Sequence, residues 1–402
     1  MSSKEANVIL KITNGRIVRD GQLVSDEHLY VKDGKFVNGM NFFWDHADLV
    51  EEVIDAENAI IAPGFLDIQI NGALGVDFTA DREDLGEKLE KVAKGLLKWG
   101  CTSFCPTIVS SRPEIYSESM HLFARRDGSV EHGASILGAH LEGPFISPSK
   151  FGAHEVQTLR TAPNGVADLF DCYAIKHGET SNIAIITVAP EVEGVMEAIP
   201  ELVKEGIVVS IGHSVATTDQ AEAAVSKGAN LVTHMFNALQ EFHHRDPGII
   251  GVLGSPKQRP YYGLICDGIH SHPNSVKIAY DSHPDGVILV TDAMSAAGLP
   301  PGKYYLGNMS VDKSSDRVYI TGTKTLAGSV VTIDECVQNF QKFTGCSVVE
   351  AIEAATLHPA KALGITHKKG TFKDGADADI VFLDDELNVK RVFVSGQEVP
   401  LE

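Results

Sequence analysis

From residue 63 onward, short apolar runs alternate with longer segments of helical pattern, and this alternation limits the fold more than any other feature of the chain. The longer segments, of which 83–99, 192–205 and 217–227 are the clearest, carry apolar residues three and four positions apart. Eight strands alternating with helices fit a (β/α)8 TIM-like barrel better than an open sheet, although counting alone does not separate the two. The candidate strands are residues 65–70, 102–109, 134–141, 183–189, 207–211, 231–233, 261–266 and 286–290.

The two ends of the chain have a different, β-rich pattern without a helical period. Residues 8–18 fit a hairpin around Asn14-Gly15, and residues 28–37 fit a second hairpin around Asp33-Gly34. Beyond Gly364 the chain returns to this pattern. We therefore predict that both ends pair into one small β-sandwich domain.

The predicted domain division follows from this change of pattern. The small β-sandwich domain would contain residues 1–62 together with 365–402, and the barrel domain residues 63–364. Within the barrel domain, residues 308–325 fit an inserted β-hairpin, and 332–343 and 348–362 fit two further helices.

Composition narrows the class of protein. The net charge of −20 argues against a general nucleic-acid or anionic-membrane surface. No apolar run approaches a membrane span, and the N-terminal residues lack a signal-peptide core. The six cysteines form no Cys-x-x-Cys pair and mostly lie in apolar runs, as reduced core thiols do. We therefore expect a cytoplasmic protein that binds neither nucleic acid nor membrane.

Titratable side chains follow the candidate strands at equivalent points. Because the carboxyl ends of barrel strands meet at one mouth, these side chains are expected to converge there. They belong to Asp67, Glu142, His213, His234, Asp267, His270 and Asp292.

Glu142, His213 and His234 form a candidate metal site. Taken singly, a buried carboxylate more often caps a loop, and a buried histidine is more often a hydrogen-bonded core residue. At matching strand ends, however, the three side chains supply the ligand set of a catalytic zinc-type site. A metal there would lower the pKa of its bound water, and Asp292 could take the proton from that water. The alternative for Asp292, a structural carboxylate held by backbone amides, remains open at this point.

Several short motifs, in order between about residues 63 and 382, carry a resemblance to a known family. They are Pro63-Gly64-Phe65-Leu66-Asp67 with Gln69 and Asn71-Gly72, His140-Leu141-Glu142-Gly143-Pro144-Phe145, Gly212-His213-Ser214, Thr233-His234-Met235-Phe236-Asn237-Ala238, Asp246-Pro247-Gly248, Asp267-Gly268-Ile269-His270, Val290-Thr291-Asp292-Ala293, Leu326-Ala327-Gly328-Ser329 and Gly375-Ala376-Asp377-Ala378-Asp379. In combination they resemble the amidohydrolase superfamily, and within it the N-acetylglucosamine-6-phosphate deacetylases.

The resemblance implies a metal-dependent hydrolase that removes the N-acetyl group of N-acetyl-D-glucosamine 6-phosphate and releases acetate. Asp292 would act as general base and then as general acid, and His154 would help to stabilise the oxyanion. Most two-metal members of the superfamily resemble one another in a His-x-His at the first strand, where this chain has Asp67-x-Gln69. One divalent metal per chain is therefore expected, with Zn first and Co, Fe or Mn as alternatives.

The same resemblance implies where the amino-sugar phosphate binds. Arg245, in the tripeptide His243-His244-Arg245, matches the phosphate-binding position, and in this family that arginine can come from the neighbouring subunit of a homodimer. A solvated loop is the alternative interpretation of this tripeptide. The substrate-binding positions implied are Ala153, His154, Asn237, Ala238, Arg245, Asp267, His270, Leu326, Ala327 and Gly328.

Two other functions compete with this interpretation. One is another amidohydrolase activity, such as a cyclic amidase or a dihydroorotase-like reaction, against which the missing His-x-His and the presence of Asn237-Ala238 with Arg245 both argue. The other is a non-catalytic scaffold with the same barrel. A scaffold predicts a damaged ligand set, whereas Glu142 and Asp292 are present together with both histidines.

Overall fold

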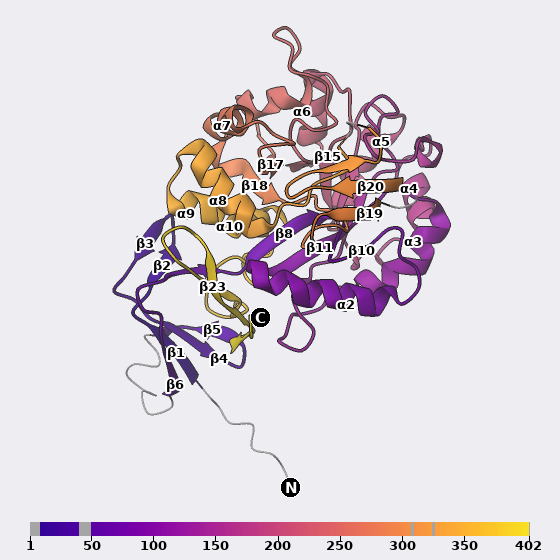
Figure 1. The fold of residues 1–402 in the computed structure, drawn as a ribbon. Coiled ribbons are helices and arrows are strands. Elements are labelled where there is room, and N and C mark those ends of the chain that lie inside the picture. Colours follow the sequence, from indigo (N-terminus) through magenta and orange to yellow (C-terminus); the bar gives the residue numbers. More distant parts are fainter. Residues whose placement is uncertain (1–8, 40–49, 307–308, 324–325, 402) are drawn as a thin grey trace.

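The computed structural model describes residues 9–39, 50–306, 309–323 and 326–401. A barrel with surrounding helices forms the larger part of the molecule, and small sheets lie beside it (Figure 1). Residues 1–8, in which no signal-peptide core was expected, lie outside the described residues, as do the ends of the predicted hairpin at 308 and 325. None of the described helices is long and apolar enough to cross a membrane.

Parallel strands form the predicted (β/α)8 barrel, with one strand at each of the eight candidate positions. Most of these strands are buried along their whole length, as strands covered on both faces must be. Their C-terminal ends lie together at one mouth of the barrel. In chain order they are β8 (Phe65–Ile70), β11 (Cys101–Val109), β12 (Ser135–Ile136) with β13 (Ala139–Glu142), β14 (Ile183–Val188), β15 (Val208–Ile211), β16 (Leu231–Val232), β17 (Tyr261–Ile265) and β18 (Val287–Val290).

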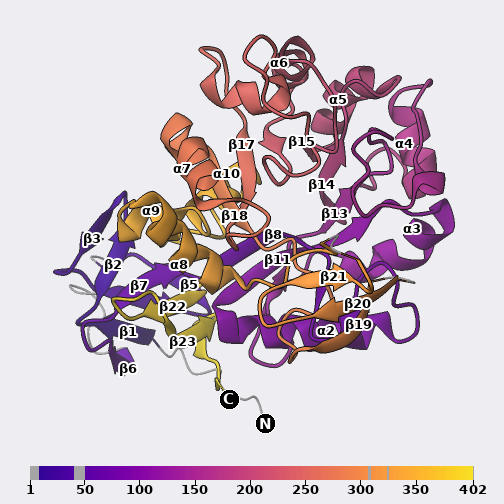
Figure 2. The ribbon, with the colours of Figure 1, turned by 45° about the horizontal axis from the view of Figure 1, so that its top comes forward.

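Helices cover the outside of the barrel (Figure 2). Each buries an apolar stripe: α2, for example, buries Leu85, Leu89, Val92, Ala93 and Leu96. Capping boxes begin α6, α8 and α9. The α-helices are α2 (Leu85–Leu96), α3 (Pro113–Ser119), α4 (Val166–Tyr173), α5 (Val195–Lys204), α6 (Thr218–Ser226), α7 (Pro273–Ser282), α8 (Ile333–Thr344), α9 (Val348–Glu353) and α10 (Leu357–Ala362). The 3₁₀ helices are η2 (Leu97–Trp99), η3 (Met120–Phe123), η4 (Val156–Thr158), η5 (Gly248–Gly254) and η6 (Pro284–Gly286).

The predicted strand 134–141 is divided into two pieces. Gly138 separates β12 from β13 and has a left-handed backbone, with φ of 103°. Both pieces pair with β11, β12 near its start and β13 near its end. The third barrel strand therefore keeps its path, but its ladder is interrupted where only glycine adopts this conformation easily.

The predicted helix 348–362 is likewise divided, into α9 and α10. Pro359 has no backbone N–H and cannot donate to the carbonyl of Ala355 as a continuous helix would require. That carbonyl instead accepts a hydrogen bond from the backbone N–H of Leu66 in β8 at 2.8 Å, and the carbonyl of Ala354 accepts one from Leu289 in β18 at 2.9 Å. The break turns both carbonyls toward the first and last strands of the barrel.

Both chain ends contribute to the same small β structure, as predicted. In the six-stranded sheet β24-β23-β22-β7-β2-β3, the C-terminal strand β22 pairs with β7. A four-stranded sheet β5-β4-β1-β6 packs against it through a second apolar core. The exact division at 62/63 and 364/365 stays a prediction. The strands are β1 (Ile9–Thr13), β2 (Arg16–Arg19), β3 (Gln22–Val24), β4 (Leu29–Lys32), β5 (Lys35–Val37), β6 (Val50–Asp55), β7 (Ile60–Pro63), β22 (Ile380–Leu383), β23 (Val389–Val394) and β24 (Gln397–Glu398).

One of the two predicted N-terminal hairpins is wrong. β4 and β5 pair around Asp33-Gly34, as expected. In contrast, β1 and β2 belong to different sheets: β1 pairs with β4 and β6, and β2 pairs with β3 and β7. Residues at Asn14-Gly15 therefore carry the chain from one sheet to the other, because both edges of β1 and both edges of β2 are already paired with other strands.

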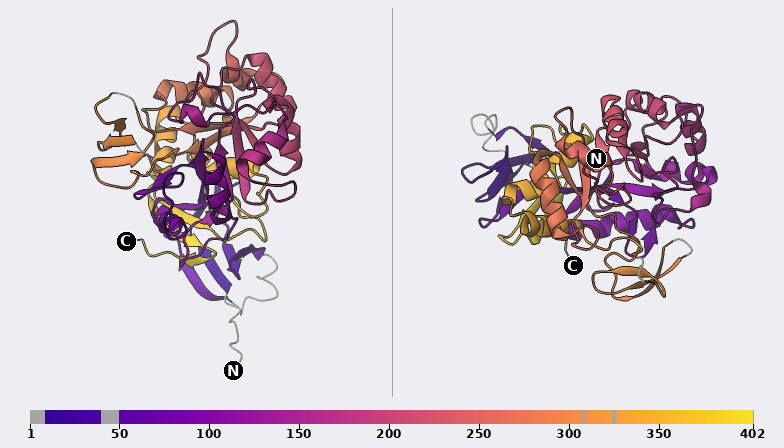
Figure 3. Two further views of the ribbon diagram at one scale, coloured as in Figure 1. Left: turned by 90° about the vertical axis from the view of Figure 1, so that its right-hand side faces the viewer. Right: turned by 90° about the horizontal axis from the view of Figure 1, so that it is seen from above.

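A separate sheet stands where the inserted hairpin was predicted. It has three strands, β19 (Gly302–Leu306), β20 (Met309–Lys313) and β21 (Val318–Ile320), and therefore begins earlier than expected. Figure 3 shows it projecting from the side of the barrel in both views. A further short pair, β9 (Gly72–Ala73) and β10 (Val76–Asp77), follows β8.

Candidate active site

The three predicted metal ligands meet at the mouth of the barrel. Glu142 is the last residue of β13, and His213 and His234 each come two residues after a strand, β15 and β16. Nε2 of His213 and Nε2 of His234 both lie 3.0 Å from Oε1 of Glu142, and 3.0 Å from each other. All three residues are buried. The structure thus brings together the Glu-His-His group that the sequence predicts.

The donor atoms of this group are arranged as metal ligands are. Nδ1 of His213 donates to the backbone carbonyl of Lys150 at 2.8 Å, so Nε2 is the ring nitrogen that faces the group. Nδ1 of His234 is buried and has no hydrogen-bond partner among the described residues. Two imidazole nitrogens and one carboxylate oxygen that converge in this way fit a divalent metal ion.

A proton can take the place of a cation in this group. Burial alone would lower the pKa of His234, but its hydrogen bond to Glu142 and the carboxylate charge raise that pKa to about 9. Burial would also raise the pKa of Glu142, yet the two histidines hold it well below its usual value. The carboxylate therefore stays ionised in a buried position, and metal and proton compete for the same site.

Three residues of the site have a left-handed backbone. The φ angles of His213, His234 and Asp292 are 48°, 27° and 47°, and each residue follows a barrel strand closely. This conformation is unfavourable for residues with a Cβ and persists only where the surrounding structure fixes it. Such positions cluster at functional sites, which agrees with the roles that the sequence suggests for these three residues.

Asp292 lies beside the Glu-His-His group and is joined to it through an amide side chain. Nε2 of Gln69 donates to Oε1 of Glu142 and to Oδ1 of Asp292, at 3.2 Å in each case. Nδ2 of Asn71 donates to the same Oδ1 at 2.7 Å. An amide nitrogen has no lone pair to offer a metal, so in this orientation Gln69 is a hydrogen-bond donor to both carboxylates.

The environment of Asp292 suits a group that both takes and gives a proton. Burial and the negative charge of Glu142 raise its pKa to about 6, while His234 and the hydrogen bond from Asn71 act in the opposite direction. A carboxyl group whose pKa is near the working pH can serve as general base and then as general acid.

His154 completes the inner part of the site. Its ring lies 4.5 Å, centroid to centroid, from that of His213. Nδ1 of His154 accepts hydrogen bonds from the backbone N–H and the hydroxyl of Ser110, at 3.1 and 2.7 Å. Burial and the neighbouring His213 lower its pKa to about 3, so the ring is neutral and its proton is on Nε2. His154 is therefore a fixed, uncharged N–H donor.

The other predicted substrate positions lie around this inner part. Asp267 and His270 form a pair, with Nδ1 of His270 at 2.6 Å from Oδ2 of Asp267. Ala238, which accepts a backbone hydrogen bond from Ser214, and Asn237 are half-buried in the segment after His234. The segment with Leu326, Ala327 and Gly328 leads to Ser329, which bridges to Ala293 beside Asp292.

Two predicted positions are not brought to the Glu-His-His group. Arg245 is exposed, and its guanidinium makes no ion pair or hydrogen bond within the described part of the chain. Ala153 is exposed next to the buried His154. A guanidinium without a partner among the described residues is available to bind an anion.

Sequence reasoning overlooked three groups that position the site. Ser110 holds His154, and it directly follows β11, a strand end that the search for titratable groups passed over because serine does not titrate. Asn71 stood in a motif but received no role. The carbonyl of Lys150 orients His213, and because it is a backbone group no side-chain pattern could reveal it.

Comparison with known proteins agrees with this geometry. Residues 60–399 match the amidohydrolase family. N-acetylglucosamine-6-phosphate deacetylase from Danio rerio is 48% identical over 97% of this chain and 96% of its own length. The Mus musculus protein of the same name is 46% identical over 97% of this chain and 95% of its own.

A solved structure shows the same fold. The crystal structure of N-acetylglucosamine-6-phosphate deacetylase from Pasteurella multocida has a TM-score of 0.83 and 29% sequence identity, covering 97% of this chain and 99% of that one. The barrel and the sheets beside it are therefore shared along nearly the whole length of both proteins. On these grounds, this chain belongs to the amidohydrolase family.

Proposed function

We propose that this protein is an N-acetylglucosamine-6-phosphate deacetylase, which hydrolyses N-acetyl-D-glucosamine 6-phosphate to D-glucosamine 6-phosphate and acetate. The observation that carries the proposal is the half-buried Asp292 fixed by Gln69 beside the convergent Glu142, His213 and His234. The relatives that match along nearly the full length bear this name.

We further propose one divalent metal ion per chain, held by Glu142, His213 and His234. When bound, such an ion would polarise the acetyl carbonyl and lower the pKa of water. Zinc is the first candidate, and Co, Fe and Mn are accepted by the same donor set. The amide of Gln69 supports a single ion, because it donates to the carboxylates where a second ion would need a ligand.

Asp292 moves the proton of the reaction. In its ionised form it takes a proton from the attacking water as the new C–O bond forms at the acetyl carbon. The protonated carboxyl then donates that proton to the sugar nitrogen as the C–N bond breaks, which releases a neutral amine and acetic acid. The acid then loses its remaining proton to water and becomes acetate. Gln69 and Asn71 both donate to Oδ1, and in the described structure no hydrogen bond falls on Oδ2, which is thus the oxygen available for the proton.

His154 stabilises the negative charge that develops on the carbonyl oxygen. Ser110 holds its Nδ1 as an acceptor, so the only proton of the ring is on Nε2. A neutral, fixed donor suits this role because it need not reorganise as the charge forms.

The sugar phosphate would bind to the segments that surround the Glu-His-His group and Asp292. We assign the phosphate to Arg245 with His270, and the sugar to His154, Asp267 and the remaining positions, Ala153, Asn237, Ala238, Leu326, Ala327 and Gly328. The exposed, unpaired Arg245 supports a homodimer in which this side chain completes the site of the neighbouring subunit.

A cytoplasmic location is consistent with the cysteines and with the proposed substrate. All six cysteines are free and buried, as expected of a protein that folds in a reducing compartment. An amino-sugar phosphate is also a charged metabolite that does not cross membranes unaided.

The test is acetate release from N-acetylglucosamine 6-phosphate, measured before and after chelation and after zinc is restored. We expect turnover that chelation abolishes and zinc recovers. A cyclic amide substrate turned over in preference would support the other amidohydrolase activity, and metal binding without turnover of either substrate would support the scaffold.

A further inference from the structure

The barrel has one junction, between its first and last strands, at which no strand pairing closes it. β8 and β18 are its first and last strands, and no ladder joins them anywhere in the described ranges. Near the base of the barrel, Leu66 and Leu289 donate instead to the carbonyls of Ala355 and Ala354, between α9 and α10. The junction between the two strands therefore depends on individual contacts, and these contacts decide where the end of β18 lies.

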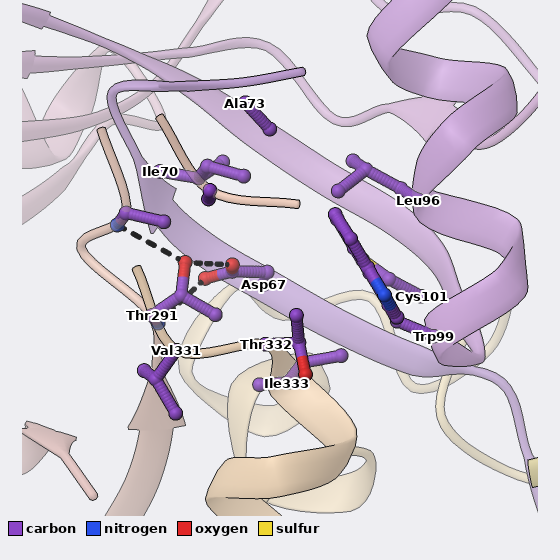
Figure 4. A pocket seen from close by; sticks show the side chains of 12 residues that line it. Asp67, Ile70, Ala73, Leu96, Trp99, Cys101, Thr291, Val331, Thr332 and Ile333 are labelled. Atoms are coloured by element: carbon purple, nitrogen blue, oxygen red, sulfur yellow. Dashed lines mark hydrogen bonds between the residues drawn. The ribbon is translucent and has the colours of Figure 1, made fainter. Parts of the chain in front are cut away.

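Asp67 and Thr291 make one of the side-chain contacts across this junction. Oδ2 of Asp67 accepts a hydrogen bond from the Thr291 hydroxyl at 2.5 Å, and Oδ1 accepts one from the Thr291 backbone N–H at 3.3 Å (Figure 4). The Thr291 oxygen in turn accepts the N–H of Ala293 at 3.2 Å. Asp67 thus fixes the residues on both sides of Asp292.

A second connection runs from Asp67 to Asp292 along β8. Oδ1 of Asp67 also accepts the backbone N–H of Gln69 at 3.3 Å, and the Gln69 carbonyl accepts the N–H of Asp292 at 2.8 Å. The side chain of Gln69 donates to Asp292 as well. One carboxylate therefore anchors both the turn that contains Asp292 and the strand that holds its side chain, and this turn has the unfavourable φ of 47°.

The surroundings of Asp67 exclude a direct part in binding substrate. The residue is 1% exposed, and its neighbours include Leu96, Trp99 and Ile333. The cavity beside it measures about 10 Å³, which is room for one water molecule at most. Burial raises the pKa of Asp67 to about 7. Burying a carboxyl group here lowers the stability of the fold, and an apolar side chain could fill the same space without that loss. The carboxyl group therefore serves a purpose other than packing.

We infer that Asp67 is a positioning residue, an inference that rests on the proposed function. Through the Thr291 hydroxyl and Gln69, Asp67 holds Asp292 in the geometry needed for proton transfer. It touches neither the substrate positions nor the Glu-His-His group. Its loss should consequently lower kcat and leave KM and metal content almost unchanged, since misplacement of a reacting group by about 1 Å can cost 100-fold in rate.

The experiment compares three threonine variants with the wild-type protein. Thr291→Val removes the hydroxyl and keeps the shape, and Thr291→Ser restores the hydroxyl. Thr102→Val is the matched control, since Thr102 is a buried barrel-strand threonine whose hydroxyl has no hydrogen-bond partner among the described residues. Asp67→Asn, which is also isosteric, replaces Thr291→Val should that variant fail to fold.

Two readouts are taken on the zinc-loaded proteins: kcat and KM for deacetylation, and amide hydrogen exchange of the peptide that contains residues 288–296. For Thr291→Val we expect kcat to fall about 10- to 100-fold with KM within twofold. Exchange in the peptide should rise at least tenfold, and Thr291→Ser should recover both values. Thr102→Val should match the wild type.

The outcomes separate this inference from the proposed function. Unchanged kcat or unchanged exchange in Thr291→Val overturns the role of Asp67, as does a loss of kcat that Thr291→Ser does not recover. If the wild type fails to release acetate while exchange responds as expected, the proposed function fails and the positioning of Asp292 by Asp67 stands.

Discussion

Replacement of Lys369 tests how a buried charge joins the barrel to the small sheets. Its ammonium group lies 2.5 Å from Oδ2 of Asp379, 2.9 Å from Oδ2 of Asp377 and 2.8 Å from the hydroxyl of Ser135 in β12. The three charged side chains are each 5% exposed or less. Lys369→Met would leave two carboxylates in a buried place without this cation.

The expected cost follows from what remains after the change. Asp377 keeps an ion pair with Lys35. Among the described residues, the side chain of Asp379 keeps only the backbone N–H of Ser395, at 2.9 Å, as a hydrogen-bond partner. Removing one partner of a buried ion pair costs about 3–5 kcal/mol, and the retained Lys35 pair places this case near 3 kcal/mol. For a chain of 402 residues the unfolding entropy is about 0.8 kcal/mol per kelvin, so the thermal midpoint should fall by about 4 °C.

The assay is thermal unfolding of the intact protein by calorimetry, with Lys368→Met as the control. Lys368 is the neighbouring residue and pairs with Asp127, but this pair is open to solvent, with the side chains 39% and 63% exposed. Such a surface pair contributes about 1 kcal/mol or less, so its midpoint should move by about 1 °C at most. Equal midpoints for the two variants would refute the reasoning.

Four further predictions concern the site. Asp292→Asn should keep its metal, measured by elemental analysis, and lose about 100- to 10,000-fold in kcat, and a near-normal rate would exclude Asp292 as the base. A base works only when it is ionised, and a bound cation lowers the pKa of about 6 that Asp292 has without one. As the pH decreases, kcat/KM of the zinc-loaded enzyme should therefore fall only below about pH 6. A fall that begins above about pH 7 would contradict the assignment of Asp292 as the base. Arg245→Ala should raise KM about 10- to 100-fold for the phosphorylated sugar and little for the unphosphorylated one, whereas equal effects would remove the phosphate from Arg245. Chelation should lower the thermal midpoint as well as the rate, and added zinc should restore both, since a ligand of the native state stabilises it.

The barrel and its ligand group could be predicted because each depends on a local pattern. Most barrel strands lie in short, mainly apolar runs, and Glu142, His213 and His234 stand at or just after the ends of such runs. The topology then brings them together without any further information, because parallel strands of a barrel end at the same mouth.

What sequence patterns missed depends on contacts between distant segments. The chain does turn at Asn14-Gly15, but β1 and β2 pair with other strands in two different sheets. Pro359 could have suggested the break between α9 and α10, but not that Ala355 would bond to β8. Likewise, Asp67 was expected among the titratable groups at the barrel mouth, whereas its carboxylate is bonded to Thr291 away from the Glu-His-His group. Its partner Thr291 is far away in the chain, and an uncharged residue gives no sign of such a role.

The pairing of β7 with β22 has a consequence for synthesis of the protein. In this pair Ile60 faces Leu383, so one edge of β7 lacks its partner while nearly all of the chain leaves the ribosome. An unpaired strand edge is a template for association with other chains. In the nascent protein, this edge of the apolar strand β7 therefore stays unpaired while all the barrel residues are translated. Conditions that slow translation near the end of the message should then increase aggregation more than conditions that slow it at the start.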